Sequence, residues 1–154
     1  MKIMKKISLF IFTLISMFAF TFGVSALDVN DEASLREALS KGGDVKLTEN
    51  ITTSTKRIII DKDVNLDLNG KTLTSLIDVT SNKTLTISSS VEGGKFVALA
   101  NEYSDEEKKD VETVYAIGAD NAKVIVNSGD VSSNDKQYGF YALNGGTIII
   151  NGGN

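Results

Sequence analysis

The sequence predicts an all-β fold, a β-solenoid of short stacked strands that begins with one helix and follows an export signal. Three observations support this prediction: a basic and then apolar leader, one segment with helical signals, and a strand-turn unit that recurs after Gly43. Repetition of short strands with a period of about 20 residues is typical of stacked arrays.

The leader has the three parts of a secretory signal. Three lysines and no acid lie within the first six residues, an apolar run extends over residues 7–22, and Val24-Ser25-Ala26 offers small or apolar side chains for cleavage. An uncleaved membrane anchor is the alternative, but a spanning helix needs about 20 apolar residues and this run is shorter. We therefore expect a signal peptide over residues 1–26, cut after Ala26. The mature chain would be extracellular or at the cell surface, with no stable membrane span.

Composition limits the partners of the mature chain. Without the three lysines of the leader, 13 basic residues face 20 acidic residues, a net charge of −7. This balance excludes nucleic acid as an expected partner, because phosphate binding needs a basic face. The chain contains no Cys, so it has neither a disulfide framework nor a lipidated cysteine.

The segment 27–43 is predicted to hold a capping helix. Asn30 or Asp31 can cap its start, and Gly42 can take the left-handed position after its end. Leu35, Ala38 and Leu39 form one narrow apolar stripe. A helix of this length is marginal alone, so we expect it to cover the first end of the solenoid.

Residues 44–154 are predicted to form the coils, as four copies of one unit of three short strands. The second strands of these copies are predicted to end at Leu68, Ile87, Val126 and Ile150. Alternation in Val64-Asn65-Leu66 puts apolar side chains on one face. A β-sandwich is the alternative, but here the similar strands are separated by a whole unit, so like should stack on like.

Polar residues at the corners agree with stacking. An asparagine or serine follows each predicted second strand, at Asn69, Ser88, Asn127 and Asn151. Asparagine tolerates the left-handed backbone of a sharp corner, and its amide can bond to the same amide in the next coil. We interpret these residues as structural rather than as a row of ligands.

Several segments together resemble the N-terminal part of the pectate-lyase-like, right-handed parallel β-helix proteins. They are residues 34–39, 43–47, 64–73 and 84–87. Many bacterial cell-surface and adhesin-like proteins belong to this superfamily. The resemblance implies a helix-capped β-helix outside the cell, but it implies no activity, because this fold carries lyases, hydrolases, adhesins and inert stalks.

Two acidic segments carry oxygen ligands of the kind that Ca²⁺ prefers. Asn65-x-Asp67-x-Asn69 imitates the start of an EF-hand loop, but Leu76 stands where the bidentate glutamate belongs. The inserted loop 101–112 is rich in hard oxygen ligands that suit only Ca²⁺, although a charged excursion is the commoner outcome. No metal or cofactor site is assigned in either segment.

The sequence assigns no catalytic residue. Lyases similar to this fold use an aspartate cluster with an arginine base, and the chain has only Arg36 and Arg57. Similar hydrolases use paired aspartates with a histidine, and the chain has none. Tyr115, Phe140 and Tyr141 could form a carbohydrate-binding strip, with Tyr115 and Tyr141 at equivalent places in adjacent copies. Packing between coils is the alternative use of these rings.

The expected function is that of a secreted or cell-surface, non-catalytic β-helix module, adhesin-like or a structural stalk, with carbohydrate or host-surface ligands. The fourth copy breaks off at Gly152-Gly153-Asn154, so we expect the front of a longer protein, or end-to-end self-association of exposed strand edges. The alternative is the N-terminal non-catalytic portion of a polysaccharide lyase or glycoside hydrolase.

Overall fold

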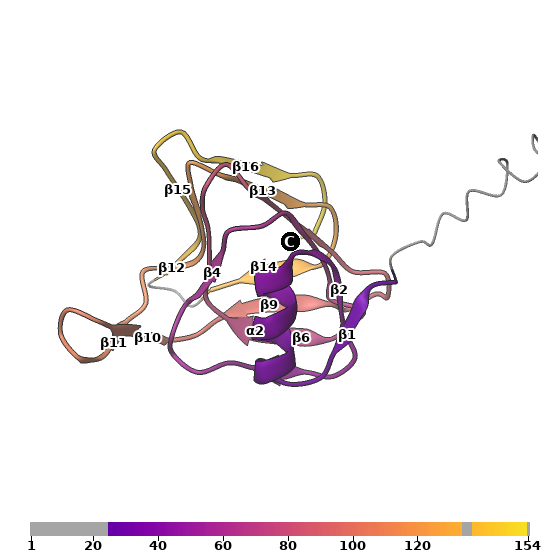
Figure 1. Ribbon diagram of the computed structural model, residues 1–154, viewed down its shortest axis with the longest axis horizontal. Helices are drawn as coiled ribbons and strands as arrows, with labels where there is room; N and C mark the ends of the chain where they lie inside the picture. Colours follow the sequence, from indigo (N-terminus) through magenta and orange to yellow (C-terminus); the bar gives the residue numbers. More distant parts are fainter. Residues whose placement is uncertain (1–24, 134–136, 154) are drawn as a thin grey trace, which may run out of the picture.

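The computed structural model describes residues 25–133 and 137–153 (Figure 1). The predicted signal peptide lies outside them except for its last two residues, so the prediction of export is not tested. Within this part of the chain, no helix is long and apolar enough to span a bilayer.

In the described residues, the fold consists of three parallel sheets, one helix and one hairpin. Sheet 1 has the strand order β1-β2-β5-β8-β13-β16, with bounds Leu27–Val29, Gly43–Leu47, Val64–Asp67, Thr84–Ser88, Lys123–Val126 and Thr147–Ile150. Sheet 2 has the order β3-β6-β9-β14, with bounds Ile51–Thr52, Thr72–Ser75, Lys95–Ala98 and Asp130–Ser132. Sheet 3 has the order β4-β7-β12-β15, with bounds Ile58–Ile60, Ile77–Val79, Tyr115–Asp120 and Tyr138–Leu143.

The chain visits the three sheets in turn. It passes through β2, β3 and β4, then β5, β6 and β7, then β8, β9 and β12, then β13, β14 and β15, and each strand pairs in parallel with its equivalent in the next turn of the chain. This confirms the prediction of an all-β, solenoid-like fold in which like strands stack on like, and it excludes the antiparallel sandwich.

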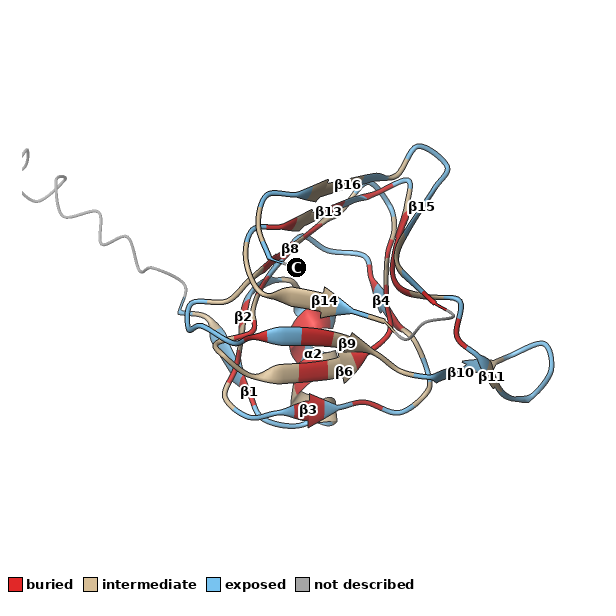
Figure 2. Ribbon diagram, turned by 180° about the vertical axis from the view of Figure 1, so that it is seen from behind, coloured by how far each residue is buried: buried red, intermediate tan, exposed pale blue. Residues whose placement is uncertain are grey.

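In the first coils the interior is filled by alternate residues of the strands, whereas β12 buries four residues in succession. In β5, Val64 and Leu66 are buried whereas Asn65 is exposed, and Leu85 and Ile87 repeat the pattern in β8. Sheet 2 behaves in the same way, and Figure 2 shows its buried positions side by side in β6 and β9. Burial of each large apolar side chain stabilises the fold by about 1.5–3 kcal/mol. The stacked rows therefore supply most of the stabilisation of the coils.

The predicted helix is confirmed as α2, Glu32–Lys41. The Asp31 side chain accepts a hydrogen bond from the Ser34 amide at 2.7 Å, which completes a capping box. Gly42 has φ +78° and closes the helix. The predicted stripe of Leu35, Ala38 and Leu39 is buried in the core, where α2 contacts β1, β2 and β4. In Figure 1 the helix lies in front of the coils, across the space that they enclose.

The segment 27–43 is not helical throughout, as a strand precedes the helix. β1 begins at Leu27 and pairs in parallel with β2, Leu27 opposite Val45. β2 and β3 also precede the first predicted copy, which begins at Ile58 with β4. The sequence prediction missed β1 and β3 because they are only three and two residues long, too short to show a period.

The predicted alignment of copies was wrong by two residues at β5 and between β7 and β12. Leu66, not Leu68, pairs with Ile87. In sheet 3 the repeat predicted that Val79 is equivalent to Ile117, but Val79 pairs with Ala119. Leu68 misled the alignment because it lies beyond the end of β5 and is nonetheless fully buried at the corner. An apolar residue at a corner extends the apparent strand without being part of its ladder.

The corner asparagines have two different roles. Asn151 donates from Nδ2 to Oδ1 of Asn127 at 2.9 Å, so the predicted amide-to-amide bond exists between these two coils. Asn69 is not in this row, because Asp67 is the residue that pairs with Ser88. Asn69 instead has the left-handed φ of +49° and donates to the backbone of β2 at 2.8 Å. Asn69 thus turns a corner and bonds to the backbone of the preceding coil, whereas Asn127 and Asn151 connect coils through their side-chain amides.

The inserted loop is an antiparallel hairpin rather than an irregular or helical excursion. β10, Asn101–Ser104, pairs with β11, Lys109–Glu112, and the hairpin projects from the side of the molecule in Figure 1. Its base is attached to the chain before β4: the Tyr103 amide donates to the Thr55 carbonyl at 2.9 Å. Thr55 also donates from its hydroxyl to Asp110 at 2.8 Å. These bonds hold the hairpin beside sheet 3.

Candidate functional site

A partly buried charge cluster lies where the hairpin meets sheet 3. Arg57, directly before β4, donates from Nε to Oε2 of Glu102 at 3.0 Å, and its Nη1 lies 3.4 Å from Oδ1 of Asp78. Only 12% of the Arg57 side chain is exposed. Its Nη2 also donates to the Tyr115 carbonyl at 3.1 Å. One guanidinium therefore joins β4, β7, β12 and the hairpin.

An aromatic stack continues outward from this arginine. The Arg57 guanidinium carbon lies 4.2 Å from the centre of the Tyr115 ring, within range of a cation–π contact. The Tyr115 ring stacks on Tyr141, with centroids 5.2 Å apart and an interplanar angle of 26°. Tyr115 also donates its hydroxyl to Asp78 at 3.4 Å. The Tyr115 ring, which packs on the Arg57 guanidinium, therefore supports one face of the Tyr141 ring.

Gly118 makes this arrangement possible. A Cβ at this position would lie 2.8 Å from Cε2 of Tyr115 and 2.3 Å from Oδ1 of Asp78, both closer than real contacts. Gly118 pairs with Tyr141 in the sheet. The missing side chain leaves the space in which the Tyr115 ring reaches its diagonal neighbour.

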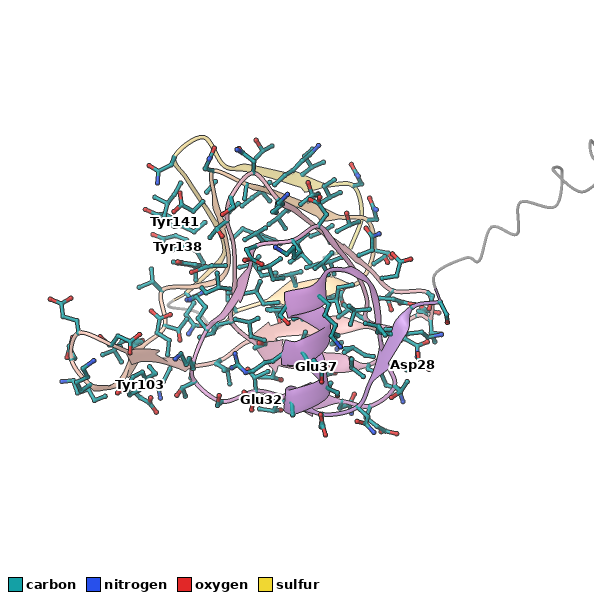
Figure 3. The ribbon with its side chains drawn as sticks, viewed as in Figure 1. Asp28, Glu32, Glu37, Tyr103, Tyr138 and Tyr141 are labelled. Atoms are coloured by element: carbon teal, nitrogen blue, oxygen red, sulfur yellow. The ribbon has the colours of Figure 1, made fainter. Side chains whose placement is uncertain are left out.

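The predicted equivalence of Tyr115 and Tyr141 was therefore wrong, although the two rings do meet. In the ladder Tyr115 pairs with Tyr138, and Tyr141 is three residues further along β15. Phe140, the third residue of the predicted strip, packs against the core instead. Figure 3 shows Tyr138 and Tyr141 on the same side of the molecule beside β15, and Tyr103 on the hairpin.

Burial and charge shift two pKa values in the cluster. Burial raises the pKa of Asp78 above its usual value, although the positive charge of Arg57 opposes the shift. Burial also raises the pKa of Tyr115 to about 12, and the negative charge of Asp78 adds to this. The phenol stays protonated at neutral pH and can remain a donor to Asp78. The polar groups of the cluster therefore satisfy one another.

The residues of the EF-hand-like segment bond to neighbouring coils. Asn65 donates to Oδ1 of Asp44 at 2.7 Å. Asp67 accepts from the hydroxyl of Ser90 at 2.6 Å and from the Ser90 amide at 2.8 Å. Burial opposes ionisation of Asp67, but these hydrogen bonds outweigh it and lower its pKa. Their roles are structural, because each connects one coil to another.

The acids of the segment 101–112 are spread along the hairpin. Asp110 accepts from Thr55, Glu107 pairs with Lys109 at 2.8 Å, and Glu102 is held by Arg57. In the described ranges, no three carboxylates, histidines or cysteines come together as a metal site would require. The hairpin distributes its acids instead of gathering them.

Of the two arginines, Arg36 lies away from any such cluster. It pairs with Glu32 one helical turn earlier at 2.8 Å and donates to the Lys56 carbonyl at 2.6 Å, which holds α2 to the chain before β4. Sequence reasoning missed the grouping around Arg57 because its carboxylates come from a strand and an insertion 21 and 45 residues away. A repeat pattern cannot predict an ion-pair partner such as Glu102, because that residue lies in an insertion outside the repeat.

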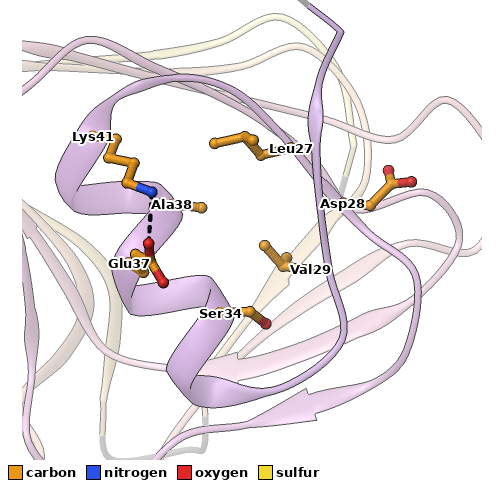
Figure 4. A pocket seen from close by; sticks show the side chains of 7 residues that line it. All are labelled: Leu27, Asp28, Val29, Ser34, Glu37, Ala38 and Lys41. Atoms are coloured by element: carbon orange, nitrogen blue, oxygen red, sulfur yellow. Dashed lines mark hydrogen bonds and ion pairs between the residues drawn. The ribbon is translucent and has the colours of Figure 1, made fainter.

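A second hollow lies at the other end of the molecule, between β1 and α2. Leu27, Val29 and Ala38 supply its apolar lining, and Figure 4 shows the ion pair of Lys41 with Glu37, at 2.6 Å, on its rim. Both charged side chains of this pair are more than half exposed. Among the polar residues that line the hollow, Glu37 and Lys41 bond to each other and Ser34 bonds to Asp31, so the cluster at Arg57 is the stronger candidate.

Comparison of the chain with family models, with curated proteins and with solved structures found no match. The candidate site therefore rests on its geometry.

Proposed function

We propose that this chain is a secreted or cell-surface β-helix module that binds its ligand without transforming it, in the manner of an adhesin or a structural stalk. The finer fold proposed with it is a right-handed parallel β-helix of the pectate-lyase-like kind, capped by α2. Parallel in-register sheets and a helix packed on the core support this fold, and the leader supports export.

The observation that carries the proposal is the internal pairing of the charge cluster. A catalytic acid or base must be within reach of substrate and poised to exchange a proton. Arg57 is almost fully covered and is shared between Asp78 and Glu102, while Tyr115 has a pKa of about 12. Groups held in this way stabilise a surface and position the rings above it. The cluster thus favours binding over chemistry.

One observation favours the alternative, a portion of a polysaccharide lyase or glycoside hydrolase. The pKa of Asp78 is raised, as it is in carboxyl groups that act as general acids in glycoside hydrolysis. A second carboxylate, Glu102, lies across the same guanidinium. Hydrolysis by this pair would require Arg57 to release one of them when substrate binds.

Export and turnover can be tested on the full chain expressed in a bacterial host with its own leader. N-terminal sequencing of the protein outside the cytoplasm should begin at Leu27. The purified product, incubated with neutral, cationic and polyuronate polysaccharides, should produce neither new reducing ends nor unsaturated sugars. Turnover that disappears in Asp78→Asn would establish the enzymatic alternative. Retention of the intact leader inside the cell would refute export.

A further inference from the structure

We infer that Tyr138 and Tyr141 form a platform for a neutral glycan chain, whose sugar rings pack on the tyrosines. This inference rests on the proposed binding function and names its ligand. The two residues are the most exposed aromatics of sheet 3, at 65% for Tyr138 and 41% for Tyr141. They lie on the same strand and on the same side of the molecule (Figure 3).

Preorganisation distinguishes this platform from scattered surface aromatics. An exposed tyrosine on a flexible surface must be ordered when a ligand binds, and this ordering weakens affinity. Tyr141 is already held, because Tyr115 stacks against it and Arg57 packs on Tyr115. The Tyr141 residue remains substantially exposed although its ring has this support. The stack presents an aromatic surface in one fixed orientation.

Polar groups suited to sugar hydroxyls lie further along the same two strands, because Gly118 pairs with Tyr141 and Asp120 pairs with Leu143. Asp120 and Asn144 come from the end of β12 and the turn after β15, and the amide of Asn144 donates to Oδ1 of Asp120 at 2.6 Å. Asn144 takes the left-handed φ of +48°, which fixes the turn. The second carboxylate oxygen can accept a hydroxyl hydrogen, and the Asn144 amide can both donate and accept. Aromatic surface with a few fixed polar groups is the usual chemistry of a small-molecule site.

Charge selects the class of glycan. Besides burial, the negative charges of Glu102 and Asp120 both raise the pKa of Asp78, so these carboxylates lie close enough to interact beside the guanidinium of Arg57. The cluster therefore holds three carboxylates and one guanidinium, and like charges disfavour a polyuronate. Arg57 is occupied by Asp78 and Glu102, so it is not available to an acidic sugar. A neutral chain meets the aromatic surface without this repulsion.

The test uses the full mature chain and three soluble probes: hydroxyethyl cellulose as the neutral chain, chitosan as the cationic chain and polygalacturonate as the anionic chain. Affinity electrophoresis measures how far each polysaccharide retards the migration of the protein. Tyrosine fluorescence reports on the rings directly, because the chain has four tyrosines and no tryptophan. We expect binding to the neutral probe. Tyr141→Ala should weaken it at least tenfold, about 1.4 kcal/mol, and Tyr141→Phe should retain it. Tyr103→Ala, at 39% exposure on the hairpin, is the matched control and should bind as the wild type does.

Three results would overturn the inference: no binding to the neutral probe, equal loss in the Tyr103 and Tyr141 variants, or stronger binding to chitosan or polygalacturonate at high salt, where attraction between charges is screened. Circular dichroism of each variant establishes that it is folded, and Tyr138→Ala provides a second test of the platform. A chain that is exported, cleaves no glycan and fails to bind the neutral probe would refute the platform while the proposed function stands. Cleavage of any probe would refute the function itself.

Discussion

Replacing Arg57 with glutamine should destabilise the protein far more than the same replacement at Arg36. Arg57→Gln leaves Asp78 and Glu102 without their cation, and the two side chains are only 22% and 24% exposed. Removal of one partner from a fully buried ion pair costs about 3–5 kcal/mol. Partial exposure reduces this to about 2–3 kcal/mol, and the lost contact with the Tyr115 ring adds about 1 kcal/mol.

Arg36→Gln is the matched control, because it removes the other arginine of the chain. Arg36 pairs with Glu32 within one helix, and both side chains are 31% exposed. Helical pairs of this kind contribute about 0.3–0.5 kcal/mol. In urea unfolding followed by circular dichroism, the unfolding free energies of the two variants should therefore differ by about 2 kcal/mol or more at neutral pH. The dependence of the unfolding free energy on urea concentration should be the same in both.

Lowering the pH should reduce the loss of unfolding free energy that Arg57→Gln causes. The pKa of Asp78 is raised in the folded protein, so the native state binds its proton more tightly than the unfolded chain does. The contribution of this group to stability is therefore greatest below its unfolded pKa and falls as the pH rises through its folded pKa. Equal unfolding free energies for the two arginine variants, or a deficit that grows in acid, would refute the reasoning.

Four further substitutions test the core, the hydrogen bonds between coils and the aromatic stack. Phe96→Ala removes the largest fully buried side chain and should lower the unfolding free energy by about 3–5 kcal/mol in urea; a loss below 1 kcal/mol would contradict the packing of sheet 2. Asp67→Asn should cost about 1–2 kcal/mol at pH 7 through its bonds to Ser90. Because the folded pKa of Asp67 is lowered, the wild type should lose this advantage as the pH falls below about 4, which thermal unfolding at several pH values checks. In a spectrophotometric titration, the wild type should show one phenol ionising near pH 12 that Tyr115→Phe lacks, and Gly118→Ala should shift that component because the new methyl group displaces the ring.

Much of the coil architecture is readable in the sequence because it depends on local and repeating patterns. Alternation along Val64–Asp67 gives the inward and outward faces of a strand, and the same alternation returns in Thr84–Ser88. The helix was equally predictable, since its cap, its apolar stripe and its closing glycine all lie within one short segment. The strand register was harder, because Leu68 is buried at a corner and imitates a strand residue.

The sequence by itself determined the parallel stacking of short strands, the helix before them, the excess of acidic over basic residues and the presence of an export-like leader. Only the tertiary structure decided which polar groups meet. Arg57, Asp78 and Glu102 come from three different elements, and the glutamate belongs to an insertion outside the repeat. The contact of Tyr115 with Tyr141 is diagonal and depends on the empty space over Gly118. Periodicity specifies which residues stack directly, whereas diagonal contacts and contacts to insertions depend on side-chain volume and direction in the folded chain.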